Sequence, residues 1–269
     1  MSSRGIYANM QTTRWPMSEK FEMHAHSRYE ILYFICGDAD YAVEGNVYSL
    51  KSGDIMLMRK SESHYLKLRS NTEYRRVVLN FDPDLFYDLD EEGKILSIFK
   101  DRPLGRFNHY PAKLFPDNQW GYYCQKMCYT SKQWERRIYL LALLAELSGC
   151  YDRIVEETEI PEQGVASLLS DYINTHLFDE LSLEKLSSVF FLSRSQLNRI
   201  FKKDMGSTLY NYILLKRLFH SQKLLRDGVN PNKVSKDCGF NDYVSFYKAY
   251  KKLFSVSPKA DFVKSSDEN

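Results

Sequence analysis

Two patterns of hydrophobic positions divide this chain. Between residues 20 and 82, short runs of aromatic and β-branched residues alternate with turn residues such as Gly37, Gly45 and Gly53. Runs that recur about every ten residues predict an antiparallel sandwich or barrel. From about residue 118 onward the apolar positions instead repeat every three or four residues, which predicts helices. We therefore predict an α+β protein with two domains, the first an antiparallel β-barrel with trailing helices and the second all-α.

The boundary between the two predicted domains follows from a change of composition. Residues 118–151 predict two helices, and the second, ERRIYLLALLAELSGCY, is strongly apolar. The next stretch, DRIVEETEIPEQ, is acidic, contains a proline and lacks periodicity, as linkers often do. We predict a first domain over residues 1–155, a linker over 156–164 and a second domain over 165–269.

The second domain carries a helix-turn-helix pattern. Apolar residues at 183, 186, 189 and 190 define one helix. Ser193 and Gln196 then form a capping box of the type S-x-x-Q, which predicts that a new helix begins at Arg194. Two helices separated by so few residues are typical of a helix-turn-helix unit.

The same pattern occurs a second time. Asn230-Pro231 predicts a helix start, because asparagine caps well and proline suits the first helical position. That short helix ends near Gly239, and Asn241 or Asp242 caps another helix with an apolar stripe. A longer helix, from about residue 208 to 225, connects the two units. The second domain is therefore predicted to hold two helix-turn-helix units joined by one linker helix.

Charge distinguishes the two halves. The net charge of the 269 residues is only +2, but residues 164–264 hold 16 Lys and Arg against 9 Asp and Glu, whereas residues 1–160 hold 21 against 23. A basic second half with two helix-turn-helix units favours double-stranded DNA as its partner. The second helix of each unit enters the major groove, where Arg reads guanine and Asn or Gln reads adenine. The predicted DNA-binding residues are Arg194, Ser195, Gln196, Asn198, Arg199, Lys202, Tyr243, Val244, Tyr247, Lys248, Lys251 and Lys252.

These motifs resemble the AraC/XylS family of bacterial transcriptional regulators. The resemblance rests on LSRSQLNRIFKK, on Arg217 and Leu224-Leu225 of the linker helix, and on GF…F…YKK…SP, all in the family's order. It implies that Ser195, Asn198 and Arg199 contact bases, as do Val244, Tyr247 and Lys248. Two positions that are usually glycine in the family are Phe191 and Ser255 here. We expect Arg217 to form a structural ion pair.

The first domain resembles the cupin barrels that many such regulators use to sense an effector. His24, His26 and Glu30, followed by Gly37, resemble the first cupin motif, and Gly53-Asp54 followed by His64 resembles the second. On a strand, His24 and His26 would point to one side. Imidazole and carboxylate together suit zinc, nickel, manganese or iron.

Three interpretations of this cluster remain open. His24, His26, Glu30 and His64 hold a divalent metal, or they line a metal-free pocket for a polar effector, or they are structural remnants. The predicted effector-binding residues are His24, His26, Glu30, Tyr33 and His64. We expect a sugar-like or other polar metabolite, because Tyr33 and neighbouring aromatic residues offer a stacking surface.

The predicted function is therefore a sequence-specific regulator that responds to a small molecule, and not an enzyme. The resemblance implies an activator of carbohydrate or other carbon-source genes that recruits RNA polymerase and dimerises through the apolar helix within 118–151. No run of 18 apolar residues and no signal sequence are present, so a cytoplasmic protein without a membrane partner is expected. The alternatives are a metal-dependent cupin enzyme fused to a DNA-binding module, and an effector-free regulator controlled by a protein partner.

Overall fold

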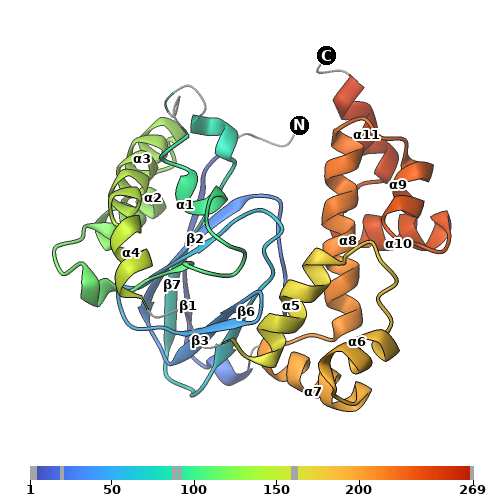
Figure 1. Cartoon of the computed structure of the whole chain (residues 1–269). Coiled ribbons are helices and arrows are strands. Elements are labelled where there is room, and N and C mark those ends of the chain that lie inside the picture. Colours follow the sequence, from blue (N-terminus) through green and yellow to red (C-terminus); the bar gives the residue numbers. More distant parts are fainter. Residues whose placement is uncertain (1–4, 19–20, 87–88, 90–92, 159–162, 267–269) are drawn as a thin grey trace. The chain divides into compact units, whose positions relative to one another are not determined.

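The computed structural model describes residues 5–18, 21–86, 89, 93–158 and 163–266. The chain divides into two compact units, and the main boundary between them in the sequence follows Ser167. The first unit contains all eight strands of the described residues and the second contains only helices, which confirms the predicted α+β class (Figure 1). Of the predicted linker, residues 156 and 157 belong to a helix, and residues 159–162 lie outside the described residues.

Two antiparallel sheets form the first unit. The five-stranded sheet has the order β1 (Tyr7–Thr13), β7 (Tyr74–Phe81), β2 (Tyr29–Cys36), β5 (Ile55–Met58) and β8 (His109–Tyr110). The three-stranded sheet has the order β4 (Asn46–Ser49), β3 (Ala39–Val43) and β6 (His64–Leu68).

The alternation of β2 gives its two faces different roles. Leu32 and Phe34 point into the core between the two sheets, where Tyr41 and Leu66 of the smaller sheet meet them. Ile31 points to the opposite face and packs under the helices. Those helices are α1 (Ser97–Lys100), α2 (Trp120–Tyr129), α3 (Gln133–Gly149) and α4 (Tyr151–Glu157). Helices α2 and α3 lie along one side of the sheets in Figure 1.

A buried ion pair joins the barrel to the segment between α1 and β8. Arg102 and Glu62 are both fully buried, and the guanidinium donates to both carboxylate oxygens, at 2.5 and 2.8 Å. Arg102 also donates to the carbonyls of Ile98 and Leu57. The Glu62 carboxylate accepts a further hydrogen bond from the backbone N–H of Gly105. This network holds the crossing segment against β5.

The second unit consists of α5 (Val165–Thr175), α6 (Leu183–Phe190), α7 (Arg194–Met205), α8 (Leu209–Arg226), α9 (Pro231–Asp237), α10 (Tyr243–Phe254) and α11 (Pro258–Ser266). The capping box is confirmed, since Ser193 Oγ accepts from the Gln196 N–H while Gln196 Oε1 accepts from the Ser193 N–H. Asn230 caps α9, and Asp242, rather than Asn241, caps α10. The linker helix α8 begins and ends one residue later than predicted.

Phe191 and Ser255 show why glycine is common at these two positions. Both residues lie in the left-handed region, with φ of 52° and 60°, and each ends a helix. A residue with a Cβ atom pays an energetic cost there that glycine avoids. Phe191 and Ser255 thus adopt the left-handed backbone conformation that favours glycine, although neither residue is glycine.

Candidate effector pocket and DNA-binding face

A cavity of about 620 Å³ opens beside the core between the two sheets. Its lining includes His24, His26 and Glu30 from the predicted site, together with Tyr41 of the smaller sheet. A volume of this size falls within the range of small-molecule sites, about 300–1,000 Å³.

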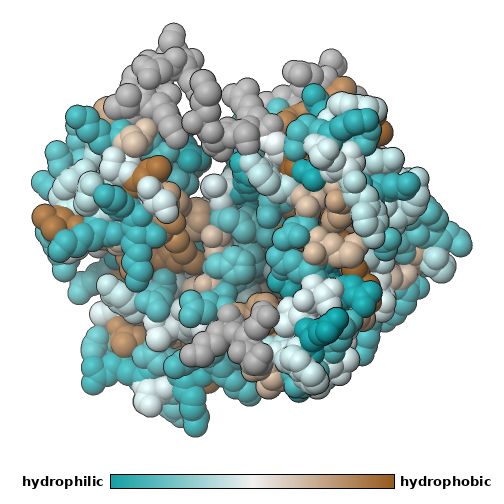
Figure 2. All heavy atoms as spheres, turned by 180° about the vertical axis from the view of Figure 1, so that it is seen from behind, coloured by the Kyte–Doolittle hydropathy of each residue, from teal (hydrophilic) through white to brown (hydrophobic). Residues whose placement is uncertain are grey.

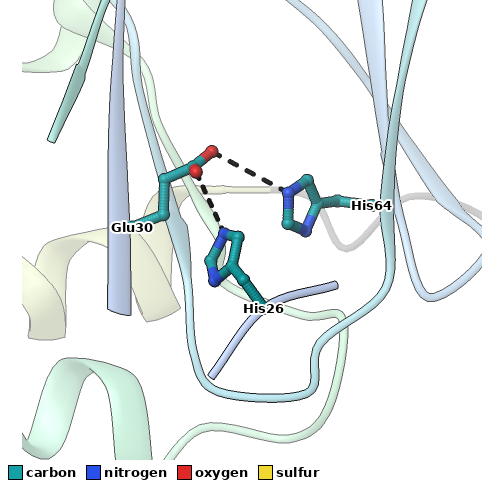
Figure 3. A group of neighbouring side chains, drawn as sticks. All are labelled: His26, Glu30 and His64. Carbon is teal, nitrogen blue, oxygen red and sulfur yellow. Dashed lines mark hydrogen bonds and ion pairs between the residues drawn. The ribbon is translucent and has the colours of Figure 1, made fainter. Parts of the chain in front are cut away.

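Three of the four predicted cupin-type residues converge beside this cavity. In Figure 3 the Glu30 carboxylate lies between two imidazoles, and each imidazole faces a different oxygen. His26 Nε2 lies 3.0 Å from Glu30 Oε2, and His64 Nε2 lies 3.8 Å from Glu30 Oε1. One donor atom from each of His26, Glu30 and His64 lies within 4.8 Å of the others. This arrangement fits either a divalent metal or a hydrogen-bonding site for a ligand.

The two ring environments shift the pKa values of the imidazoles in opposite directions. Burial lowers the pKa of His26, but the hydrogen bond and charge of Glu30 more than offset this, so the pKa is raised. Burial lowers the pKa of His64 to about 4, although Glu30 acts in the opposite direction. Burial would raise the pKa of Glu30, but the hydrogen bond from His26 and the charges of both imidazoles lower it to about 2. At neutral pH Glu30 is therefore ionised and His64 is neutral.

The fourth residue, His24, packs its ring against the edge of His64, with the ring centroids 4.3 Å apart, but it does not belong to the group of converging ligand atoms. Its side chain is exposed, and its Nδ1 lies 2.9 Å from the carbonyl oxygen of Glu22. The segment that holds His24 and His26 is not a strand, because only His24 pairs, in an isolated bridge with His64. The expected strand is therefore wrong, although both side chains do line the same cavity.

Tyr33 lies on the other side of the sheet from the cavity. It packs against the core under the helices, and its hydroxyl approaches Gly121 of α2 so closely that a Cβ there would lie 2.5 Å away. The physical reason is the alternation of β2, since Glu30 and Tyr33 differ by an odd number of positions and so face opposite sides. The structure therefore places Tyr33 outside the pocket lining.

Strand β7 contributes a part of the pocket that was not predicted from the sequence. Tyr74, Arg76, Val78 and Asn80 line the cavity from alternate positions of this strand. Asn80 lies opposite Glu30 in the register of β2 and β7, and its Nδ2 donates to Glu30 Oε2 at 2.9 Å. The alternation in EYRRVVLNF carries this signal, because residues two apart share a face.

The first recognition helix, α7, exposes most of the residues predicted to contact DNA. Leu197 and Phe201 are fully buried, whereas Ser195, Arg199 and Lys202 are exposed. Asn198 is half-buried.

Two residues of α7 already have partners within the unit. Gln196 Oε1 serves the capping box, and Arg194 forms an exposed ion pair with Glu184 of α6. Gln196 is engaged because it caps its own helix. Arg194 reaches Glu184 because the turn between α6 and α7 is short. These two side chains are therefore less available for reading bases than Ser195 and Arg199.

The second recognition helix, α10, has the same division. Phe246 and Tyr250 are fully buried. The predicted contact residues lie exposed or half-exposed on the remaining surface of the helix, and they are Tyr243, Val244, Tyr247, Lys248, Lys251 and Lys252. On the face that Figure 2 shows, hydrophilic residues cover most of the molecule and hydrophobic residues form separate patches.

Arg217 of α8 binds three backbone carbonyls, so the expected ion pair is wrong. Its Nε donates to Leu177 at 3.0 Å, its Nη2 to Asp179 at 3.1 Å and its Nη1 to Gly239 at 3.1 Å. The first two acceptors precede the first helix-turn-helix unit, and the third lies in the turn of the second. Through the linker helix, Arg217 therefore connects the segment before the first helix-turn-helix unit to the turn of the second.

No helix among the described residues has the length and apolar character needed to cross a lipid bilayer.

Comparisons with known proteins agree with both units. The model of the AraC-like ligand binding domain matches residues 15–169, more than half of the chain, and a helix-turn-helix domain model matches residues 186–262. The probable transcriptional regulator LumQ of Photobacterium leiognathi is 39% identical over 92 residues, which cover 34% of this chain and 37% of LumQ.

Two further relatives align over most of the chain. The HTH-type transcriptional activator RhaS of Enterobacter sp. (strain 638) is 24% identical, over 89% of this chain and 86% of RhaS. The lactose operon transcription activator of Staphylococcus xylosus is 24% identical, over 82% of this chain and 78% of that protein. These relatives are regulators of transcription and not enzymes. A ligand-binding barrel followed by two helix-turn-helix units, with matches to both domain models, places this chain in the AraC family of transcriptional regulators.

Proposed function

We propose that this regulator is a cytoplasmic transcription activator whose barrel pocket binds a small polar effector without a metal. The observation that carries the proposal is the pocket itself, where ionised Glu30 and its imidazole partner His26 line a cavity with aromatic walls. The imidazole and amide that hold the Glu30 carboxylate orient it for a ligand hydroxyl. The names of the RhaS and lactose operon activators support activation, and the second supports carbon-source genes as the target.

A metal is less well supported than a hydrogen-bonded ligand. His26, Glu30 and His64 offer three ligands, but His24 does not join them, and Glu30 Oε2 already accepts hydrogen bonds from His26 and Asn80. Stoichiometric metal by elemental analysis, together with turnover of a sugar or diol, would instead support the fused cupin enzyme.

The experiment that tests the proposal is a footprint of the purified protein on fragments of its source genome at fixed salt. We expect discrete sites beside a few operons, with occupancy that changes when the products or substrates of those operons are added. Binding that is only diffuse would contradict sequence-specific regulation. Discrete sites with no response to any metabolite would support the regulator that a protein partner controls.

DNA binding is expected to depend differently on Arg199 and Lys252. Both are exposed, on α7 and α10 respectively. Arg199→Ala removes a base contact, so it should weaken binding to the cognate operator by about 1–3 kcal/mol and relax specificity at one position. Lys252→Ala removes a phosphate contact, so it should weaken all sequences similarly and reduce the salt slope by about one unit.

Titrations of cognate and scrambled operators at several salt concentrations check both expectations. Lys223→Ala, at an exposed position of the linker helix, is the control. An unchanged affinity of Arg199→Ala for the cognate operator would rule out its assigned role.

We also propose that the chain forms a homodimer through α3. Leu140, Leu143, Leu144 and Leu147 of this helix are buried in the core. Trp134 and Ile138 remain 61% and 57% exposed, and Ala145 continues the same outward stripe at helical spacing. A second copy of this helix covers such a stripe, which is otherwise apolar surface in water. In the dimer, the two recognition helices of each chain occupy direct or inverted half-sites. The bound dimer then alters the recruitment of RNA polymerase to the promoter.

Ile138→Glu is expected to convert the dimer to a monomer, because a charge at the centre of an apolar interface is costly to bury. Its melting temperature should change little, since Ile138 packs weakly on its own barrel. Analytical ultracentrifugation measures the mass, and Ser131→Glu, exposed in the turn before α3, is the matched control. A dimer that persists in Ile138→Glu would place the interface elsewhere.

A further inference from the structure

We infer that the effector is a carboxylated polyol, such as a sugar acid, whose carboxylate binds Arg76 and whose hydroxyls bind Glu30. This inference rests on the proposed function and narrows the class of ligand. It follows from three groups that line the same cavity: the Arg76 cation without a carboxylate partner, the Tyr74 hydroxyl without a hydrogen bond, and the ionised Glu30 acceptor.

Arg76 has no carboxylate ion pair among the described residues, unlike several other arginines of the barrel. Arg75 pairs with Glu73, Arg69 with Asp38, and Arg102 with Glu62. The Arg76 guanidinium instead lies over the rings of Tyr74 and Phe21, with its Cζ 4.7 and 5.6 Å from their centroids. Its Nη1 is buried and has no hydrogen-bond partner among the residues that the structure describes. A buried, unsatisfied guanidinium N–H is costly unless a ligand satisfies it.

The Tyr74 hydroxyl is a second donor beside this cation. Tyr74 is fully buried, and its hydroxyl also lacks a hydrogen bond within the described part of the chain. Burial raises the pKa of Tyr74, although Arg76 acts in the opposite direction, so the hydroxyl stays protonated and can donate. Tyr74 and Arg76 lie two positions apart on β7 and both line the cavity. Together they offer the N–H and O–H donors that a carboxylate accepts.

The other end of the pocket, where Glu30 of β2 lies opposite Asn80 of β7, is an acceptor. Glu30 is ionised, and its Oε2 is occupied by His26 and Asn80. Its Oε1 lies 3.8 Å from His64 Nε2, which is longer than a hydrogen bond. The carboxylate also accepts a hydrogen bond from the Tyr41 hydroxyl. Because a carboxylate offers about four lone-pair sites, Glu30 can still accept from a ligand hydroxyl. Asn80 and Arg76 are four residues apart on β7, or roughly 13 Å along the strand.

The pocket is thus polarised, and this favours one class of ligand. A neutral sugar would satisfy Glu30 but leave the Arg76 cation without a counter-charge. A simple carboxylate would satisfy Arg76 but leave the Glu30 acceptor unused. A single carboxylate on a hydroxylated chain matches both ends, and repulsion from Glu30 fixes its direction.

Isothermal titration of the full chain with matched acids and neutral sugars tests this inference. The acids are galacturonate, glucuronate and gluconate, the neutral counterparts are galactose, glucose and sorbitol, and ionic strength is held constant. We expect at least one acid to bind at least about tenfold more tightly than its neutral counterpart. Arg76→Gln should weaken that acid by roughly 10- to 100-fold, because it removes a charge-assisted hydrogen bond, and should leave the neutral sugar unaffected.

Arg75→Gln is the matched control, because it removes the neighbouring arginine of β7, which already pairs with Glu73. It should leave acid binding unchanged. Circular dichroism and melting curves establish that each variant is folded.

Two outcomes separate this inference from the proposed function. If neutral sugars bind as well as the acids and Arg76→Gln changes neither affinity, the inference that the ligand carries a carboxylate is wrong. The proposed effector pocket is still supported if Glu30→Gln abolishes the binding of the neutral sugars. If neither series binds, the carboxylated polyol is wrong, and a thermal-shift screen of sugar phosphates, amino acids and nucleosides then decides the proposed function. A hit that Glu30→Gln removes retains the pocket, and no hit contradicts an effector site there.

Discussion

Arg102→Met is expected to destabilise the barrel by about 3–5 kcal/mol, because it leaves the carboxylate of Glu62 buried without its counter-charge. Glu62 and Arg102 are fully buried. The substitution also removes donors to the carbonyls of Ile98 and Leu57, which then lie buried without this partner. A loss of this size is a large fraction of the stability of an ordinary domain.

Urea denaturation followed by tryptophan fluorescence measures this loss, since Trp120 is buried in the core of the same unit. The control is Arg69→Met, which breaks a half-exposed pair with Asp38 and should cost less than about 1 kcal/mol. The double variant Arg102→Met with Glu62→Leu should recover part of the loss, because it removes both buried charges. A loss below about 1 kcal/mol in Arg102→Met would mean that the network does not hold the crossing segment.

The same pair makes the barrel sensitive to acid. Burial would raise the pKa of Glu62, but the charge and hydrogen bonds of Arg102 lower it to about 2 from an ordinary value of 4.5. A lowered carboxyl pKa stabilises the fold above the unfolded value and is lost as the pH falls. The contribution of Glu62 is therefore complete above about pH 4.5 and disappears between about pH 4.5 and pH 2. Arg102→Met should remove most of this dependence.

Arg217→Met is expected to cost the second unit about 2–3 kcal/mol, because it deletes three charge-assisted hydrogen bonds, two of them exposed. Two of the carbonyls that it leaves behind lie just before the first helix-turn-helix unit, and the third lies in the turn of the second. The spacing between the recognition helices α7 and α10 should therefore be less well defined. We expect the variant to lose part of its preference for the natural half-site spacing, in addition to losing stability.

Denaturation of the variant and titrations with operators that carry one- or two-base-pair insertions measure the two effects separately. Lys223→Met, at an exposed position of the same helix, controls for the loss of a positive charge. A variant that is destabilised but keeps the full spacing preference would limit Arg217 to a role in folding.

Local signals predicted most of the second unit. A capping box, an Asn-Pro helix start and a three-to-four repeat each depend on residues within one turn, so Ser193, Asn230 and Asp242 are found where their patterns predict. The partners of Arg217 could not be predicted in this way. Leu177 and Gly239 are 40 and 22 residues away and contribute only their carbonyls, which every residue possesses.

The pocket shows the same limit in the first unit. The motif spacing located Glu30 and His64. Tyr33 was assigned to the site as a neighbouring aromatic residue, an assignment that did not take the alternation of the strand into account. The prediction also omitted Arg76, because an arginine next to another arginine on a strand is usually interpreted as solvated surface. Only the register of β7 against β2 brings Arg76 and Glu30 to one cavity.

Strand β2 alone separates the pocket on one face of the sheet from the helices on the other. Glu30 faces the cavity, while its neighbour Ile31 packs in the core that α2 and α3 cover. The outer surface of α3 carries Trp134 and Ile138. If α3 forms the proposed dimer contact, a ligand that moves Glu30 would also shift Ile31 and the packing beneath that helix. In the proposed dimer, effector binding and a change at the partner subunit would then be coupled through this one strand.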